Sequence, residues 1–126
     1  MKRTPLNILL AEDDYVNRTL AILLIENLGW EVTAVENGKD ALTALKTGRF
    51  DLVLMDVQMP EMNGFEATMA IREKEKETGE HIPIIALTAH AIKGDKEQCL
   101  NAGMDDYIRK PIEFKEFRST ILKTVK

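Results

Sequence analysis

Residues 52–56 have the sequence LVLMD, in which four consecutive apolar residues are followed by an acid. A continuous apolar run of this length is typical of a strand that is covered on both faces, as in the middle of a parallel sheet. Residues 8–11 (ILLA) and 84–87 (IIAL) form two further runs of this kind. Residues 32–35 and 107–109 are more polar, so we expect them at the two edges of the same sheet.

Helical patterns separate these expected strands. The first and last patterns place apolar residues on one side of a helix, namely Val16, Leu20, Leu23, Leu24 and Leu28 in the first and Phe114, Phe117, Ile121 and Val125 in the last. Strands that alternate with helices predict a parallel sheet with right-handed crossovers and helices on both faces. The sequence therefore predicts the α/β class, with a single doubly wound five-stranded parallel sheet in the order 2-1-3-4-5 and one domain over residues 1–126.

The composition limits the classes of protein and of partner. The chain has 126 residues, of which 44% are hydrophobic and 30% charged, and its net charge is −4. These values are typical of a globular domain, and the acidic balance argues against direct binding of nucleic acid. No apolar run approaches the length of about 18 residues that a membrane span requires. Cys99 is the only cysteine, so no intrachain disulfide can form, and we expect a soluble, cytoplasmic protein without a membrane partner.

Two local patterns carry structural expectations of their own. The glycines that fall between a helical pattern and a strand are expected to be left-handed helix caps; these are Gly29, Gly48, Gly79 and Gly103. Residues 72–77 (REKEKE) alternate in charge, and we interpret them as a solvated helix face without a function.

Polar side chains follow four of the expected strands. The first strand is followed by residues 12–14 (EDD), the third ends in Asp56, the fourth in Thr88, and Lys110 follows the fifth. Taken singly, each is explained as a helix cap, a turn hydroxyl or a solvated charge. In a sheet of this order, however, ligands bind at the carboxyl ends of the strands, between the first and third. Clustered carboxylates repel one another unless a cation is present, so the combination predicts a cation site.

The ligand types indicate which cation fits. No histidine or cysteine is expected near the cluster, whereas carboxylate and carbonyl oxygens suit Mg²⁺. Glu12, Asp13 and Asp56 carry three negative charges, which Mg²⁺ and Lys110 together would balance. Such a site could hold a phosphoryl group on a carboxylate nucleophile, so the chemistry indicated is that of an aspartyl phosphate.

Four motifs resemble those of the receiver domains of two-component response regulators. They are Glu12–Asp13, residues 55–64 (MDVQMPEMNG), residues 87–89 (LTA) and residues 110–112 (KPI). The resemblance extends from about residue 7 to the last helical pattern and implies a flavodoxin-like fold. Residues 88–107 are most similar to receivers attached to hybrid histidine kinases.

The resemblance implies a role for each residue of the site. Asp56 would be the phosphoacceptor. Asp13 and Asp56 would bind Mg²⁺ directly, together with the backbone carbonyl of Gln58, while Glu12 would act through a metal-bound water. Lys110 would pair with the phosphoryl oxygens. The donor would be a sensor histidine kinase or a histidine phosphotransfer domain.

The resemblance also implies a switch. Thr88 and Tyr107 would be the switch pair, and the Lys110–Pro111 bond would be cis. Gln58 and His90 would set the lifetime of the phosphoryl group. The face built by the fourth helix, fifth strand and fifth helix would dock a downstream protein partner or a second copy of the domain.

Three competing interpretations fit the sequence less well. An aspartyl-phosphate phosphatase dependent on Mg²⁺ would need a second acid two residues after the nucleophile, where this chain has Gln58. A flavodoxin-type cofactor binder would need a phosphate-cradling loop in place of residues 12–14. A degenerate receiver that serves only for docking would have lost Asp56 or Lys110. We therefore expect no enzyme beyond self-phosphorylation and dephosphorylation, either as a stand-alone receiver or as the excised end of a hybrid kinase.

Overall fold

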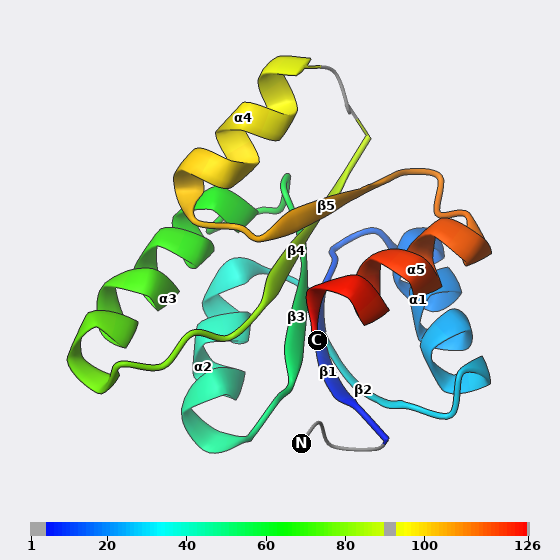
Figure 1. Cartoon of the computed structure of the whole chain (residues 1–126), viewed down its shortest axis with the longest axis horizontal. Helices are drawn as coiled ribbons and strands as arrows, with labels where there is room; N and C mark the ends of the chain where they lie inside the picture. Colours follow the sequence, from blue (N-terminus) through cyan, green and yellow to red (C-terminus); the bar gives the residue numbers. More distant parts are fainter. Residues whose placement is uncertain (1–4, 90–92, 126) are drawn as a thin grey trace.

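The computed structural model of the chain describes residues 5–89 and 93–125 and forms a five-stranded parallel sheet (Figure 1). Its elements are β1 (Asn7–Ala11), α1 (Tyr15–Asn27), β2 (Glu31–Val35), α2 (Gly38–Thr47), β3 (Leu52–Asp56), α3 (Gly64–Thr78), β4 (Ile84–Thr88), α4 (Lys93–Ala102), β5 (Asp106–Arg109) and α5 (Phe114–Thr124). The strand order is β2-β1-β3-β4-β5. This confirms the predicted fold class, the strand order and the two edge strands.

The three central strands are apolar because helices cover both faces of the sheet. Every residue of β3 and β4 is buried. The register places Leu10 of β1 beside Leu54 of β3, and Leu54 beside Ile85 of β4. Continuous burial of this kind is what the unbroken apolar runs predict.

The helices divide the core into two parts. Figure 1 shows α1 and α5 on one face of the sheet and α2, α3 and α4 on the other. The first core cluster lies under α1 and α5 and contains Leu6, Ile8, Leu10, Ala21, Ile25, Leu52, Leu54, Ile85, Leu87, Ile108, Phe117, Ile121 and Val125. The second contains Leu9, Ala11, Ala41, Val53, Met55, Ala67, Ile71, Ile84, Ala86, Cys99 and Met104. Trp30, the only tryptophan, precedes β2 and packs partly buried against the first core cluster.

The buried face of α1 differs from the predicted one. Val16 and Leu23 are 70% and 59% exposed, whereas Ala21 and Ile25 are buried against the sheet. Ala21 allows the helix to approach the sheet closely, and this orientation turns Val16 and Leu23 outward. In α5 the predicted face is confirmed except at Phe114, the first residue of the helix, which is 41% exposed.

The glycine prediction is confirmed at three of the four positions. Gly29, Gly79 and Gly103 have positive φ angles of 83°, 77° and 107°. The prediction for Gly48 is wrong, because its φ of −133° is extended. A Cβ atom at this position would lie 3.2 Å from the ring of Phe50, so close packing explains a small residue here, and a left-handed turn does not.

The charged run at residues 72–77 is solvated only in part, which corrects the interpretation of the whole run. Glu73 and Lys76 form an ion pair in solvent, with side chains 74% and 73% exposed. Arg72 and Glu75 are instead 16% and 14% exposed. They lie on the side of α3 that faces the connection leading to β4.

Four side chains there form what we call the Arg72 cluster: Arg72, Glu75, His81 and Asp105. Arg72 Nη1 donates to Glu75 Oε1 at 2.7 Å, and Nη2 donates to Asp105 Oδ2 at 2.9 Å. The other Glu75 oxygen accepts from the backbone N–H of Ile82 at 2.7 Å. The other Asp105 oxygen lies 2.8 Å from His81 Nε2. The Arg72 cluster therefore ties α3 to the amino end of β4 and to the turn before β5.

Across the residues that the structure describes, no helix combines the length and the apolar character needed to cross a bilayer.

Candidate functional site

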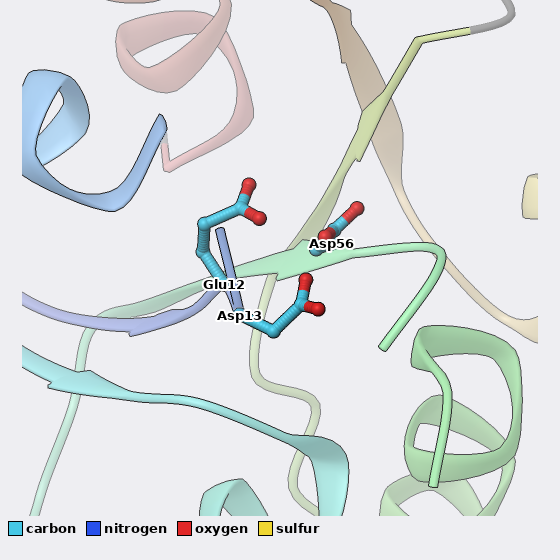
Figure 2. A group of neighbouring side chains, drawn as sticks. All are labelled: Glu12, Asp13 and Asp56. Atoms are coloured by element: carbon cyan, nitrogen blue, oxygen red, sulfur yellow. The ribbon is translucent and has the colours of Figure 1, made fainter. Parts of the chain in front are cut away.

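Three acids converge at the carboxyl ends of β1 and β3, and we call them the acidic cluster. Glu12 and Asp13 follow β1, and Asp56 is the last residue of β3. Figure 2 shows their carboxylates directed toward a common space. One ligand oxygen from each residue lies within 4.8 Å of the other two. Glu12 and Asp56 are buried, whereas Asp13 is exposed, so the cluster opens to solvent on one side.

Among the described residues, Lys110 is the cation that contacts this cluster. Its Nζ lies 2.8 Å from Glu12 Oε1 and 3.1 Å from Asp56 Oδ1, and its side chain is 13% exposed. The Lys110–Pro111 bond is cis, as expected. One ammonium against three carboxylates leaves a formal charge of −2 in a largely buried site.

The excess negative charge affects the pKa of Asp56. Burial, reinforced by the neighbouring Glu12 carboxylate, raises the pKa of Asp56 from 3.8 to about 7, and Lys110 only partly offsets this rise. Burial would lower the pKa of Lys110, but its ion pairs with Glu12 and Asp56 outweigh that effect and raise it above 10.5. A further cation at the site would therefore favour the ionised form of Asp56.

A cavity of about 700 Å³ opens above the acidic cluster. Besides the cluster and Lys110, it is lined by residues of the connections that follow β1 and β3, including Asp14 and Gln58, and by Thr88 at the end of β4. The backbone N–H of Gln58 points back to Asp56 and donates to Oδ1 at 3.3 Å. The cavity thus gives a small ligand direct access to Asp56.

The connection from β1 to α1 is held by short hydrogen bonds. The backbone N–H of Asp14 donates to Glu12 Oε2 at 3.1 Å, and Asp14 Oδ2 accepts from the N–H of Asn17 at 2.8 Å as the cap of α1. Arg18 Nη1 donates to the backbone carbonyls of Glu12 and Asp13 at 3.0 and 3.1 Å. Sequence analysis missed Arg18, because a bond to main-chain carbonyls leaves no sequence signal.

The connection from β3 to α3 is held by two glycines. A Cβ atom at Gly64 would clash with the carbonyl oxygen of Asp56, so that only glycine fits there. The N–H of Gly64 also donates to the carbonyl of Val57 at 3.0 Å. Gly38, at the start of α2, donates its N–H to the carbonyl of Met62 at 3.0 Å. Sequence analysis did not single out Gly38, whose role depends on this tertiary contact.

Of the remaining predicted residues, some line the cavity and others do not. Thr88 ends β4, is 6% exposed and lines the cavity with Gln58. Tyr107 lies apart, with a half-buried side chain that packs against the second core cluster. The Lys96 Nζ is 5.8 Å from the centre of its ring. His90 lies outside the described residues.

The donor atoms fit a hard divalent cation. The acidic cluster offers only oxygen ligands, as Mg²⁺ prefers. Within the described residues, no donor meets Glu12 Oε1 with hydrogen-bond geometry, although the Lys110 ammonium is close to it. A buried carboxylate oxygen with spare acceptor capacity can hold a metal-bound water.

A family model described as the response regulator receiver domain matches residues 8–122. The hybrid signal transduction histidine kinase I of Dictyostelium discoideum is 49% identical over 113 residues, which are 86% of this chain and 6% of that protein. The chain spans 6% to 14% of the length of the histidine-kinase relatives that it matches.

Two solved structures are similar over nearly the whole chain. The receiver domain of sensor histidine kinase PA1611 from Pseudomonas aeruginosa has a magnesium ion in its active-site cleft; it is 41% identical with a TM-score of 0.85, covering 95% of this chain and 97% of that one. The receiver domain of the Saccharomyces cerevisiae response regulator Ssk1, co-crystallised with the histidine phosphotransfer protein Ypd1, is 29% identical with a TM-score of 0.87, covering 94% and 88%.

Proposed function

This chain belongs to the response regulator receiver domain family of two-component signalling, and from that premise we propose that Asp56 accepts a phosphoryl group from a phosphohistidine. The observation that carries the proposal is the position of Asp56: a buried carboxylate at the open cavity, between two further acids and the Lys110 ammonium. The family match favours neither an aspartyl-phosphate phosphatase nor a degenerate docking module.

In the proposed reaction, an Asp56 carboxylate oxygen attacks the phosphorus atom. The P–O bond forms as the P–N bond to the donor histidine breaks, and the leaving imidazole nitrogen takes up a proton from solvent. Lys110 moves its ion pair from the carboxylates to the phosphoryl oxygens, where its charge stabilises the transition state. Because Asp56 is buried and its pKa is raised to about 7, part of this carboxyl is protonated at neutral pH. A cation that lowers the pKa of Asp56 would increase the fraction of the ionised carboxylate, which is the nucleophile.

Mg²⁺ is the cofactor that we propose for this step. Asp13 and Asp56 would hold it directly with the backbone carbonyl of Gln58, and Glu12 would act through a water. When bound, the ion would neutralise the transferring phosphoryl oxygens. The oxygen-only ligand set and the spare acceptor on Glu12 support this assignment.

The donor is proposed to dock beside the cavity, on α1. Tyr15, Val16 and Leu23 are exposed apolar side chains of this helix, at 72%, 70% and 59%. Such a patch suits the apolar face of a histidine phosphotransfer domain or of a sensor kinase helix. A donor histidine held there could reach Asp56 through the cavity.

A second surface is proposed for output. Thr88 would turn toward the phosphoryl oxygens on Asp56, and Tyr107 would rotate inward behind it. Leu100 on α4 and Phe114 on α5 are exposed at 47% and 41%, which supports a docking face for a partner or a second copy along α4, β5 and α5. The receiver would turn over no external substrate, and Gln58 with His90 would set the phosphoryl lifetime.

The family match covers residues 8–122 without interruption, which supports one receiver domain over residues 1–126. Histidine kinases draw the phosphoryl group from ATP, so we place the reaction in the cytoplasm.

The decisive test is incubation with acetyl phosphate and Mg²⁺, followed by intact-mass measurement. We expect one added phosphoryl group on the wild type and none on Asp56→Asn. Asp14→Asn is the matched control, because Asp14 lines the same cavity but caps α1, a task that asparagine performs equally well. An adduct on Asp56→Asn would refute the assignment of the phosphoacceptor.

A further inference from the structure

We propose that Arg18 is a positioning residue for the acidic cluster: it fixes the main chain that carries Glu12 and Asp13, and thereby raises the affinity of the site for Mg²⁺. The inference rests on the proposed function, since it concerns the same metal site. It assigns a role to a side chain that contacts neither the metal ligands' carboxylates nor the cavity.

Arg18 bridges α1 and the connection that precedes it. Its guanidinium donates to two consecutive backbone carbonyls, those of Glu12 and Asp13, at 3.0 and 3.1 Å. The ring of Tyr15 lies 5.7 Å from the guanidinium carbon, and a Glu36 carboxylate oxygen lies 4.0 Å from Nη2. The side chain is only 17% exposed, so these contacts hold it in one place.

The local backbone explains why such a clamp is needed. In a strand, the side chains of consecutive residues point to opposite faces. Glu12 and Asp13 are consecutive, yet their carboxylate oxygens lie within 4.8 Å of each other and of Asp56. β1 ends at Ala11, and the N–H of Glu12 makes its last bond to β2 by donating to the carbonyl of Val35 at 3.0 Å, so the main chain leaves the strand at these two acids. The two carbonyls that Arg18 binds are those of the same two acids, so the guanidinium holds the backbone of Glu12 and Asp13 in the conformation that brings their carboxylates together.

Positioning and simple electrostatics predict opposite effects on metal affinity. A nearby positive charge repels Mg²⁺, so removing Arg18 would tighten binding if charge alone mattered. If Arg18 fixes the ligands, its removal weakens binding, because residues that orient metal ligands typically contribute about 10- to 100-fold in affinity. The direction of the change therefore separates the two explanations.

The experiment titrates Mg²⁺ into the ¹⁵N-labelled protein and follows the amide resonances of Asp13 and Asp56 by NMR. We expect Arg18→Gln to raise the dissociation constant about tenfold. Arg18→Lys retains the charge and one donor, and we expect a smaller increase. The matched control is Arg109→Gln, which removes the same charge at the carboxyl end of β5; its side chain makes no hydrogen bond or ion pair within the described residues. We expect its dissociation constant to stay within twofold of the wild type.

Each alternative outcome has a defined meaning. Equal or tighter Mg²⁺ binding by Arg18→Gln would overturn the inference, as would a loss of stability in urea without a change in affinity. Should Arg18→Gln fail to fold, Arg18→Lys decides by the same criterion. If the wild type itself shows no Mg²⁺-dependent shifts, the proposed function fails first, which is distinguishable from a wild type that binds and a variant that binds equally well.

Discussion

The acidic cluster and the Arg72 cluster are two groups of charges on the same sheet, at opposite ends of its strands. In the Arg72 cluster, the four carboxylate oxygens of Glu75 and Asp105 each have a partner within 2.9 Å. In the acidic cluster, the Lys110 ammonium contacts two of the three carboxylates, those of Glu12 and Asp56, and burial raises the pKa of Asp56 to about 7.

The difference lies in the charge balance, not in the number of charges. A cluster of charged side chains whose carboxylate oxygens all have partners within the chain stabilises the fold. A group with unmatched acceptors is destabilising by itself and is explained by a ligand from outside. Four substitutions test this distinction, from the largest expected effect to the smallest.

Arg72→Met should lower the free energy of unfolding by about 3 kcal/mol, because it leaves two partly buried carboxylates without their cation. Urea denaturation measures this loss. Lys74→Met, at an exposed position of the same helix, is the control and should change little. A loss below 1 kcal/mol for Arg72→Met would show that the Arg72 cluster is not a structural unit.

Asp56→Asn should have the opposite sign. The folded state raises the pKa of Asp56 from 3.8 to about 7, so it holds this proton more tightly than the unfolded state. Ionisation therefore costs stability as the pH rises through this range, and the cost is complete above pH 7. Without metal, we expect the variant to be more stable than the wild type by a few kcal/mol at pH 8 and nearly equal to it near pH 4. A gain that does not depend on pH would contradict this explanation.

Asp13→Ala should change the stability of the protein differently in the absence and in the presence of Mg²⁺. Without Mg²⁺, relief of carboxylate repulsion should raise the stability slightly, by about 0.5 kcal/mol. At a Mg²⁺ concentration of ten times its dissociation constant, the wild type should gain about 1.4 kcal/mol. The variant should gain nothing and should not be phosphorylated. Thermal unfolding with and without Mg²⁺ measures both effects, and normal phosphorylation would reduce Asp13 to a structural residue.

Glu73→Ala should have the smallest effect. Its ion pair with Lys76 is 3.3 Å long and about three-quarters exposed, so we expect a change below about 0.5 kcal/mol. Glu73 and Glu75 are two residues apart in the same run. If Glu73→Ala lowered the free energy of unfolding as much as Arg72→Met, the contrast between the solvated ion pair and the Arg72 cluster would be refuted.

The sequence predicted what depends on local pattern. The apolar runs of β1, β3 and β4 identify central strands because burial on both faces leaves no polar alternation. The acids and Lys110 were placed at one edge because the carboxyl ends of parallel strands share that edge. The face of α1 was predicted incorrectly, since the burial of Ala21 depends on how closely the helix packs.

Long-range polar contacts account for what the sequence could not predict. Residues 72–77 look uniformly solvated in the sequence. Arg72 is instead held inward by partners from later parts of the chain, including the Gly103 carbonyl, to which its Nε donates at 2.9 Å, and Asp105. Arg18 likewise acts on main-chain carbonyls, which every residue possesses, so no residue type marks its partners.

The position of Trp30 determines how these experiments can be read. It is the only indole, and it packs against the first core cluster just before β2, at the end of the sheet away from the acidic cluster. Its fluorescence emission should therefore change when the packing between α1, α5 and the sheet is lost, and should not change when a cation binds. Intrinsic fluorescence is thus a clean reporter of unfolding for every variant, and ligand binding requires a separate spectroscopic probe.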